Sequence, residues 1–416
     1  MHARIARHTR DPLTANALAF DDGGERAVLV SCDLCMMTNA CVHEIRREAE
    51  GRWDIDADRV LLGMTHTHVG PCLLSFRDTQ VCDEPYLAGL RARLVDLVVR
   101  ALGDLEVATL YASEGHVEEM GWNRRGLKLD GSAQMYYGSW NEDFAGVEGP
   151  RDGSVPVLWA RRPDGSIKAI LTGFASHPNC CESESFYSAD FPGAVRKNLR
   201  TMLGDDVGVT YLTGAAGNTA PSIMENNPKN RQPWRSEDGL ERSGAYLAAE
   251  ILKTIQGQVD PLADQSVKVV QRRVDIPVRD WPAAFDPEAQ VRPGPGRDYS
   301  VQNRRIWPRF KAEHSPTSVR LSVVRVGDFA LCTNPAELYV ELGLAIKESS
   351  PARITMIAEL TDGYCGYVPT RQAFSRGGYS TWTAPTSSLI PEAGDQIVAA
   401  TGELLAEAFS APSLND

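Results

Sequence analysis

The sequence feature that most constrains the fold is the alternation of short apolar runs with amphipathic helical patterns along nearly the whole chain. Residues 86–102 have the clearest helical period, because leucine and valine side chains recur on one face. Strands that alternate with helices form layers in which the helices cover the faces of sheets. We therefore predict an α/β protein.

The other predicted elements follow from local hydrophobic pattern and turn signals. Two strands are expected within residues 12–33, on either side of a turn at residues 21–24. Further strands are expected at residues 60–64, 106–112, 155–160, 168–175, 208–212, 267–276, 319–326, 329–333 and 353–360. Further helices are expected at residues 41–50, 190–203, 239–255, 334–347 and 392–409.

Two long segments lack a clear period. Residues 121–153 are rich in glycine and carry aromatic side chains, which predicts a long functional loop. Residues 277–317 are rich in proline and contain Trp281 and Trp307. This second segment is either a domain linker or an insertion that lies over a cleft as a lid, and the tryptophans favour some packing.

A pair of histidines follows the strand expected at residues 60–64, in the run Thr-His-Thr-His-Val-Gly-Pro at residues 65–71. In an extended segment His66 and His68 point to the same face, so both imidazoles would aim at one spot. Gly70-Pro71 would then turn the chain away and leave the pair at a strand end. This arrangement suits a metal site or a proton-transfer site, and structural hydrogen bonds are the alternative.

Composition excludes several classes of partner. The formal net charge of -12 argues against binding of nucleic acid and against attraction to an anionic membrane. No apolar segment is long enough to span a bilayer, and no secretion signal is evident at the N-terminus, so we expect no stable membrane insertion and a cytoplasmic location. The nine cysteines include a single CxxC pair, Cys32 and Cys35, which predicts free thiols in a reducing compartment rather than a zinc knuckle.

Other polar side chains recur at the ends of predicted elements. His177 follows the strand at residues 168–175, Glu337 opens the helix at 334–347, and Tyr367 follows the strand at 353–360. Functional residues of α/β proteins gather at strand ends, and histidine and glutamate are usual zinc ligands. Each has a structural alternative: a hydrogen-bonded core histidine, a carboxylate at a helix N-terminus, and a packing aromatic ring.

Residues 65–71 resemble the THTHSGP signature of the neutral (non-lysosomal) ceramidase family, with Val69 in place of its serine. Supporting segments appear in the expected order over nearly the whole chain. They are Asp11–Leu13, Asn123–Arg124, His177, Ser188–Asp190, Gly214–Asn218, Pro335–Glu337, Gly366–Thr370 and Gly378–Tyr379. The resemblance implies layered mixed β-sheets flanked by helices, in one catalytic domain that spans residues 1–416.

The resemblance also implies a zinc-dependent hydrolase that cleaves the amide (N-acyl) bond of a small-molecule substrate. The residues that correspond to zinc ligands are His66, His177, Glu337 and Tyr367. The residues that correspond to the groups holding the attacking water and the substrate carbonyl are His68, Arg124 and Tyr379. The chemistry is consistent, because an imidazole can move a proton, and a guanidinium and a phenol can stabilise an oxyanion.

The chain departs from the family pattern in ways that concern the substrate. Asn218 stands where the family usually has aspartate, no C-terminal immunoglobulin-like domain is expected after the last helix, and no secretion signal is expected before the first strand. We therefore expect a polar or short-acyl substrate rather than a long-chain ceramide held at a membrane. The pocket walls are expected at residues 121–153 and 277–317.

Several alternatives stay open at this level. The same metal site could hydrolyse an ester or a glycosidic bond, or the chain could be a binding protein whose site no longer turns over. Arg124 could be a surface charge in a loop, and Tyr379 a packing aromatic. The pair Cys180-Cys181 beside His177 suggests a thiol nucleophile, which is disfavoured because no third orienting group is evident. The oligomeric state is not predicted.

Overall fold

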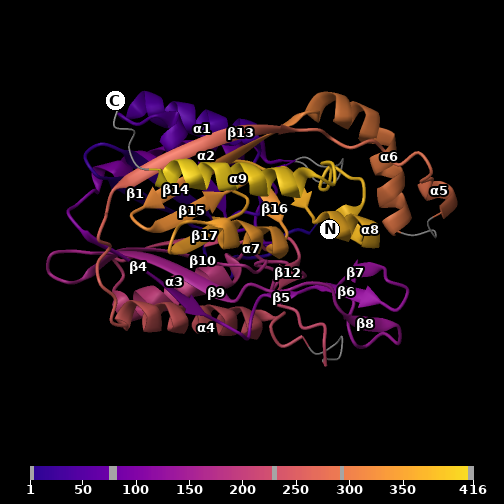
Figure 1. Ribbon diagram of the computed structural model, residues 1–416, viewed down its shortest axis with the longest axis horizontal. Helices are drawn as coiled ribbons and strands as arrows, with labels where there is room; N and C mark the ends of the chain where they lie inside the picture. The colour runs from indigo at the N-terminus through magenta and orange to yellow at the C-terminus, as the bar shows by residue number, and fades with distance from the viewer. Residues whose placement is uncertain (1–3, 75–81, 227–231, 291–294, 411–416) are drawn as a thin grey trace.

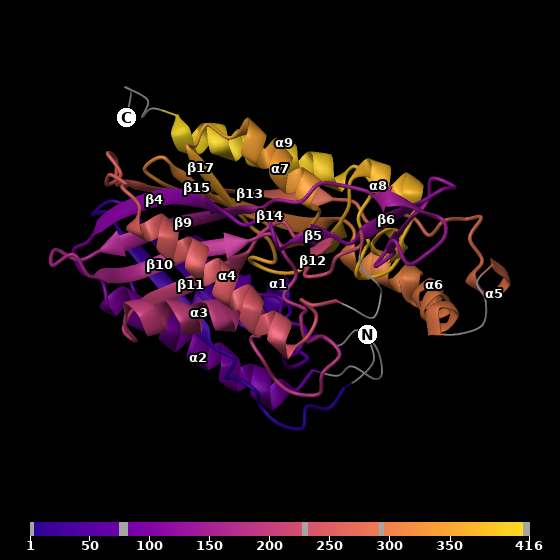
Figure 2. The same ribbon diagram turned by 90° about the horizontal axis from the view of Figure 1, so that it is seen from below.

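The computed structural model describes residues 4–74, 82–226, 232–290 and 295–410, and it is built around three mixed β-sheets with helices on their outer sides (Figure 1). The prediction of an α/β protein with layered mixed sheets flanked by helices is confirmed. Helices α7 and α9 lie along one side of the molecule and α2 along the opposite side (Figure 2).

The first sheet has the order β1-β2-β3, the second β11-β10-β9-β4 and the third β13-β14-β15-β17. Each sheet combines antiparallel pairs with one parallel pair, which is β2 with β3, β10 with β11, or β15 with β17. The strands of these sheets are β1 (Ala15–Asp21), β2 (Arg26–Cys32), β3 (Val60–Met64), β4 (Thr109–His116), β9 (Ser154–Arg161), β10 (Ile167–Phe174), β11 (Gly208–Thr213), β13 (Val267–Ile276), β14 (Thr317–Val326), β15 (Phe329–Thr333) and β17 (Ile354–Ala358).

Six helices pack on these sheets in pairs. They are α1 (Asn39–Arg52), α2 (Glu84–Gly103), α3 (Asp190–Leu203), α4 (Glu237–Gln256), α7 (Val340–Ser349) and α9 (Ala393–Phe409). Helices α1 and α2 bury apolar side chains against the first sheet, α3 and α4 against the second, and α7 and α9 against the third. Three of these helices have an N-cap side chain that accepts a hydrogen bond from a backbone N–H group. The caps are Thr38 for α1, Asp83 for α2 and Ser236 for α4.

The inner faces of the three sheets share one apolar core. Leu61 comes from the first sheet, Leu171 from the second and Leu331 from the third, and all three side chains are almost fully buried. Full burial of a leucine side chain stabilises a fold by about 1.5–3 kcal/mol. This shared core fixes the three sheets relative to one another, so their strand ends can hold a common site.

Residues 121–153 are not the long loop that the sequence predicted. They contain the short strands β5 (Trp122–Asn123), β6 (Arg125–Lys128), β7 (Ala133–Met135) and β8 (Phe144–Val147). Strand β6 pairs with both β7 and β8, and β5 pairs with the two-residue strand β12 (Thr219–Ala220). Strands of two to four residues are too short to show a period in the sequence, which explains the difference.

The proline-rich segment 277–317 joins two strands of one sheet. Strands β13 and β14 pair antiparallel from Val267↔Val326 to Ile276↔Thr317, so the segment is an insertion in a hairpin rather than a linker. It contains α5 (Pro287–Gln290) and α6 (Pro295–His314), which lie at one end of the molecule (Figures 1 and 2). Its tryptophans pack as expected, because the ring centroids of Trp281 and Trp307 lie 6.1 Å from each other.

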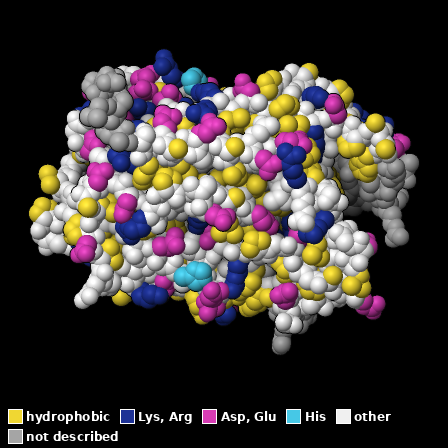
Figure 3. All heavy atoms as spheres, in the orientation of Figure 1, with side chains coloured by type: hydrophobic (Ala, Val, Ile, Leu, Met, Phe, Trp, Pro, Cys, Tyr) yellow, Lys and Arg dark blue, Asp and Glu magenta, His cyan; other side chains and the backbone are white. Residues whose placement is uncertain are grey.

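Acidic and basic side chains are interspersed over the face shown in Figure 3. Within the described ranges, the helices are all too short or too polar to cross a membrane. The short helix α8 (Arg371–Arg376) and a 3₁₀ turn at Tyr379–Thr381 complete the C-terminal half, together with β16 (Ala336–Leu338) and β18 (Gly366–Val368).

Candidate metal centre

His66, His177 and Glu337 meet at one point, although they come from three distant parts of the chain. The Oε2 atom of Glu337 lies 3.4 Å from Nε2 of His66 and 3.2 Å from Nε2 of His177. The two imidazole rings are edge-on, with centroids 4.7 Å apart. All three side chains are at most 3% exposed. The ligand atoms of the three side chains all lie within 4.8 Å of one another, so together they can hold a metal ion.

The orientation of both histidines favours a metal at their Nε2 atoms. Nδ1–H of His66 donates to the carbonyl of Cys35 at 2.7 Å, and Nδ1–H of His177 donates to the carbonyl of Ala216 at 2.6 Å. These bonds fix the tautomer that leaves Nε2 unprotonated, which is the usual support behind a metal-ligating histidine. Nε2 of His66 is buried and makes no hydrogen bond to the described residues. The donor set of two imidazoles and one carboxylate therefore fits zinc.

The electrostatics of the cluster suit a bound cation. Burial alone would raise the pKa of Glu337, but the neighbouring imidazoles hold it well below its usual range, so the carboxylate is ionised. Burial and the nearby Arg124 guanidinium lower the pKa of His177 well below its ordinary value and keep it neutral. Burial opposes protonation of His66, yet Cys35 and Glu337 outweigh it and raise its pKa. A metal ion would take the place of that proton.

The backbone at the histidine pair differs from the predicted extended segment. Strand β3 ends at Met64, and His66 has a φ of 69°, in the left-handed region. The backbone N–H groups of Thr65 and His66 donate to the carbonyls of Cys32 and Leu34, which draws the chain across the end of β2. The rings of His66 and His68 still meet, with centroids 4.8 Å apart. A non-glycine residue in this conformation costs about 1–3 kcal/mol and is found most often at functional sites.

Glu337 lies on a strand and not at the helix start that the sequence predicted. It is the middle residue of β16, and helix α7 begins only at Val340. Strand β16 pairs in parallel with β18, where Tyr367 stands directly opposite Glu337. Side chains opposite each other in a ladder lie on one face of the sheet, so the pairing places the Tyr367 phenol beside the cluster. The alternative of a carboxylate at a helix N-terminus is wrong.

Tyr367 is buried next to the cluster. Its hydroxyl lies 3.5 Å from Nη2 of Arg124, and burial together with the charge of Glu337 raises its pKa well above the usual value. A second tyrosine that the sequence reading missed, Tyr364, donates its hydroxyl to Oε1 of Glu337 at 2.8 Å. That bond orients the carboxylate so that Oε2 faces the histidines. The role of Tyr367 as a fourth ligand stays a prediction.

His68 lies beside the three-residue cluster. Its ring centroid is 4.8 Å from that of His66 and 5.5 Å from that of His177. Burial lowers its pKa, and its Nε2 atom is buried without a hydrogen-bond partner in the described part of the chain. Cys35, His66 and His68 form a second possible ligand group, but only His66 among them is fully buried. The fully buried group that includes a carboxylate is the better metal site.

Arg124 and Tyr379 flank the cluster on the side of Tyr367. The Arg124 guanidinium is 1% exposed, so the alternative of a surface charge is wrong. Its Nη2 donates to the carbonyl of Gly217 at 2.8 Å and lies 2.9 Å from Nε2 of His177. Tyr379 is 37% exposed, and its ring centroid is 5.8 Å from that of Tyr367. Tyr379 therefore stands at the solvent edge of the site.

The small-residue turn at residues 214–218 brings the backbone close to β16, as its composition predicted. A side chain on Gly217 would meet the carbonyl oxygen of Glu337 at 2.5 Å. Asn218 accepts a hydrogen bond from the N–H of Val340 and donates one to Oε2 of Glu341, each at 2.8 Å. An aspartate there would place two carboxylates together, which explains why this chain has the amide.

Glu359 supports the cluster through hydrogen bonds to two neighbouring segments. It was not singled out from the sequence, because it directly follows the apolar strand β17 and looks like the polar end of that strand. Its Oε2 accepts the N–H of Ala216 at 3.0 Å and the N–H of Leu338 at 2.8 Å. The carbonyl of Ala216 orients His177, and Leu338 follows Glu337 on β16. Glu359 thus connects the segments that orient His177 and carry Glu337.

The neighbouring cysteines do not form a nucleophilic pair with His177. Cys180 and Cys181 are buried, and burial raises the pKa of both thiols. A thiol with a raised pKa is a poor nucleophile. Neither Cys180 nor Cys181 forms a disulfide in the structure.

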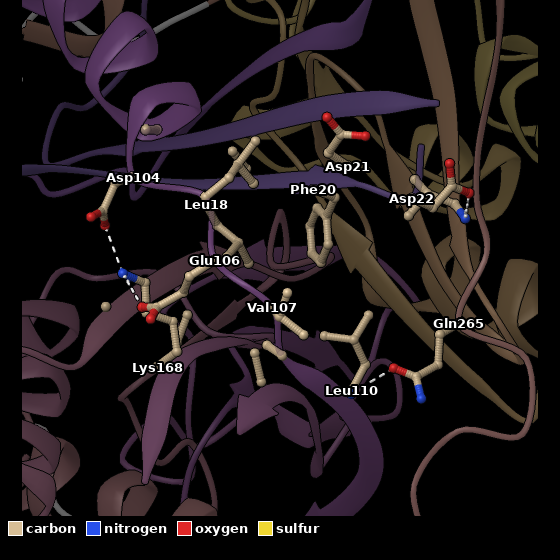
Figure 4. Close-up of a pocket in the computed structure, with 18 of the residues that line it drawn as sticks. Leu18, Phe20, Asp21, Asp22, Asp104, Glu106, Val107, Leu110, Lys168 and Gln265 are labelled. Carbon is tan, nitrogen blue, oxygen red and sulfur yellow. Dashed lines mark hydrogen bonds and ion pairs between the residues drawn. The ribbon is translucent and has the colours of Figure 1, made fainter. Parts of the chain in front are cut away.

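A separate hollow lies at the opposite end of the strands (Figure 4). It has a volume of about 630 Å³ and includes none of the site residues among its walls. Its lining includes the end of β1 at Asp21 and the starts of β13, β10 and β11 at Val267, Lys168 and Gly208. The metal cluster follows the other ends of β3 and β10. Hollow and cluster are therefore separate features.

Comparison with known proteins supports the fold. No family model matches this chain. The crystal structure of neutral ceramidase from Pseudomonas aeruginosa is similar with a TM-score of 0.71 and 18% identity, over 95% of this chain and 68% of that one. A ceramidase complexed with C2 has a TM-score of 0.72 and 17% identity, over 97% of this chain and 71% of that one.

Proposed function

Because the chain has the fold of a neutral ceramidase-like domain, we propose that it is a zinc-dependent hydrolase that cleaves an amide (N-acyl) bond. The observation that carries the proposal is the convergence of two Nε2 atoms and one carboxylate oxygen in a buried position, with both Nδ1–H groups directed to backbone carbonyls. His66, His177 and Glu337 would hold the metal, with Tyr367 as the fourth ligand.

The remaining residues have roles that follow from their positions. A bound zinc ion would supply an activated water and polarise the scissile carbonyl. His68 offers an unprotonated Nε2 beside the cluster and would take the proton from the attacking water, then deliver it to the leaving amine. Arg124 and Tyr379 would donate hydrogen bonds to the oxyanion as it develops. Exclusion of water by the buried walls would strengthen these interactions.

An amide is the preferred bond because both structural neighbours are ceramidases, and the acyl group of a ceramide is held by an amide. Hydrolysis of an ester or a glycoside by the same site is the second candidate, since a shared fold does not fix the reaction. A binding protein without turnover is the third. The presence of the complete polar group, including His68 and Arg124, supports an active enzyme.

We further propose a polar or short-acyl small molecule as the substrate, handled in the cytoplasm. An acidic chain gains no electrostatic attraction to an anionic leaflet. Arg124 lies between β5 and β6, Tyr136 directly follows β7, and the Arg124 guanidinium donates to the Tyr136 hydroxyl near the cluster, so residues 121–153 would supply part of the wall. The proline-rich segment would contribute indirectly, because Arg279 donates to the carbonyl of Thr381 in the turn that begins at Tyr379.

The test is a hydrolysis screen with the zinc-loaded protein. The panel contains short-chain soluble N-acyl amides, long-chain ceramide in detergent, carboxylic esters and glycosides. We expect turnover of the short amides, and loss of that turnover in Glu337→Gln. Faster cleavage of the long-chain lipid would contradict the proposed substrate, and exclusive cleavage of esters or glycosides would contradict the proposed bond. Metal binding without turnover of any compound would support a binding protein.

A further inference from the structure

Glu182 faces His68 from the side opposite the metal cluster. It lies in the turn that follows His177, and its Oε2 atom is 3.3 Å from Nδ1 of His68. The carboxylate is 28% exposed and the imidazole 12% exposed, so the pair is largely screened from water. The local sequence does not distinguish Glu182 as a functional residue. A second glutamate stands two positions later, and residues 181–186 match no recognisable motif.

The carboxylate of Glu182 is held in place from two other directions. Nδ2 of Asn179 donates to its Oε2 at 2.9 Å, and the Arg235 guanidinium donates to its Oε1. The Arg235 guanidinium also lies over the ring of Tyr136, 4.9 Å from the centroid. Burial alone would raise the pKa of Glu182, but His68 and Arg235 hold it well below the usual range. Glu182 is therefore an ionised, oriented acceptor.

An ionised acceptor at Nδ1 decides which nitrogen of His68 carries the proton. Nδ1 must be protonated to donate to Glu182, and Nε2 then has a free lone pair. Nε2 of His68 is the atom that is buried without a partner among the described residues, next to the rings of His66 and His177. The basic nitrogen thus faces the cluster, and the carboxylate stands behind the ring.

We propose that Glu182 is a positioning residue that forms a carboxylate–imidazole dyad with His68. It fixes the tautomer and the ring orientation in which Nε2 accepts a proton, and it stabilises the imidazolium that forms when the proton arrives. The inference rests on the proposed hydrolase function, because it assigns a partner to the base of that reaction. The same arrangement of carboxylate, imidazole and reacting group recurs in hydrolases of unrelated folds.

The support of the dyad extends to the oxyanion side of the site. Nδ2 of Asn179 also donates to the hydroxyl of Tyr136 at 2.9 Å, and that hydroxyl accepts a bond from Nη1 of Arg124 at 2.7 Å. Asn179 therefore ties the carboxylate behind His68 and the guanidinium of Arg124 to one scaffold. The base and the oxyanion donor are held at a fixed separation by these bonds.

The kinetic test compares Glu182→Gln with Glu182→Asp in the zinc-loaded enzyme. Glu182→Gln removes the charge behind the imidazole, and we expect kcat to fall roughly 10- to 100-fold with KM and zinc content unchanged. Glu182→Asp keeps the charge and should recover part of the loss. The matched control is Glu184→Gln, which changes an exposed carboxylate in the same turn and should leave kcat unchanged.

A double-mutant cycle separates a dyad from a merely structural contact. In the His68→Ala background, Glu182→Gln should have no further effect on kcat, because its partner is already gone. An equal loss of kcat in both backgrounds would overturn the proposal. So would unchanged kcat in Glu182→Gln, or loss of zinc from that variant with otherwise intact folding.

A spectroscopic measurement keeps the dyad testable if the proposed hydrolase function fails. Two-bond ¹H–¹⁵N correlation spectra of the zinc-loaded protein report which imidazole nitrogen carries the proton. We expect His68 as the Nδ1–H tautomer in the wild-type protein and a changed population in Glu182→Gln. His68 as the Nε2–H tautomer in the wild-type protein would contradict the dyad, whatever the outcome of the substrate screen.

Discussion

The two ends of the β-strands in this molecule differ in how their polar groups are satisfied. At the end that holds the hollow, Lys168 pairs with both Asp104 and Glu106, and Oε1 of Gln265 accepts the N–H of Leu110 (Figure 4). At the other end, Nε2 of His66 and Nε2 of His68 are buried without hydrogen-bond partners in the described ranges. The hollow is a space whose polar groups are paired, whereas the cluster contains buried imidazole nitrogens that lack hydrogen-bond partners in the described ranges and could bind a metal or a proton.

Backbone conformation shows the same contrast. His66 has a positive φ value just after the end of β3, and Leu360 and Asp362 have positive φ values in the segment that follows β17. The strained residues are held by nearby bonds, such as that from the N–H of Asp362 to the carbonyl of Leu62 at 2.7 Å. Strain of this kind persists only where the surrounding structure fixes it, and it is concentrated at functional sites. Buried unsatisfied groups on a strained backbone therefore mark the site better than cavity volume does.

The largest expected effect comes from His177→Ala. Removing one of the four proposed ligands should abolish zinc binding, and the loss of several kcal/mol of transition-state stabilisation should lower kcat/KM by roughly 1,000-fold or more. Hydrolysis of the best substrate from the screen, measured together with metal content, checks this. Retained turnover in a metal-free variant would place the chemistry elsewhere.

His68→Ala should have the next largest effect. The variant loses the proposed proton acceptor but none of the proposed zinc ligands, so kcat should fall roughly 100-fold while zinc stays bound. Steady-state kinetics and elemental analysis of the same preparation provide the measurement. If the variant instead lost its zinc, His68 would be a ligand and its assignment to proton transfer would be wrong.

Glu359→Ala should weaken the cluster without removing a ligand. The N–H groups of Ala216 and Leu338 would lose their buried acceptor, at a cost of about 1–3 kcal/mol each in the free energy of unfolding. Zinc affinity should fall roughly tenfold or more, because the carbonyl behind His177 and the strand of Glu337 are no longer tied together. Competition with a chelator measures the affinity. Glu359→Gln, which keeps an acceptor, is the control and should lose less.

Lys168→Ala at the hollow should have the smallest effect. Its ion pairs with Asp104 and Glu106 are partly solvent-exposed, and such pairs contribute about 0–1 kcal/mol to stability. We expect unchanged kcat, KM and zinc content, with the free energy of unfolding measured by urea denaturation. A loss of turnover comparable to that of His68→Ala would show that the two ends are functionally coupled.

Hydrophobic pattern predicted most of the fold because most of its elements are locally encoded. The strand expected at residues 267–276 matches β13, and the helices expected at 86–102 and 392–409 match α2 and α9 to within two residues. The helix expected at residues 334–347 is present but begins only at Val340, because Asn-Pro followed by acidic and apolar residues imitates a helix start. Strand β16 exists only through its pairing with β18, a distant contact that local pattern does not encode.

The candidate site was predictable to the extent that its residues follow recognisable strand ends. His66, His68 and His177 carried that signal, and the structure brings them together. Glu182 and Glu359 carried none, because each acts through a partner remote in sequence: the ring of His68 in one case and the backbone of Ala216 in the other. A carboxylate that positions another group has no local pattern of its own.

Metal content is the most direct test of the central claim. The protein is purified without added metal, and zinc is quantified by elemental analysis in the wild type, His66→Ala and His68→Ala. The account predicts about one zinc ion per chain in the wild type and in His68→Ala, and loss of zinc in His66→Ala, because His66 is a proposed zinc ligand and His68 is not. Substoichiometric metal in the wild type that neither substitution changes would contradict it.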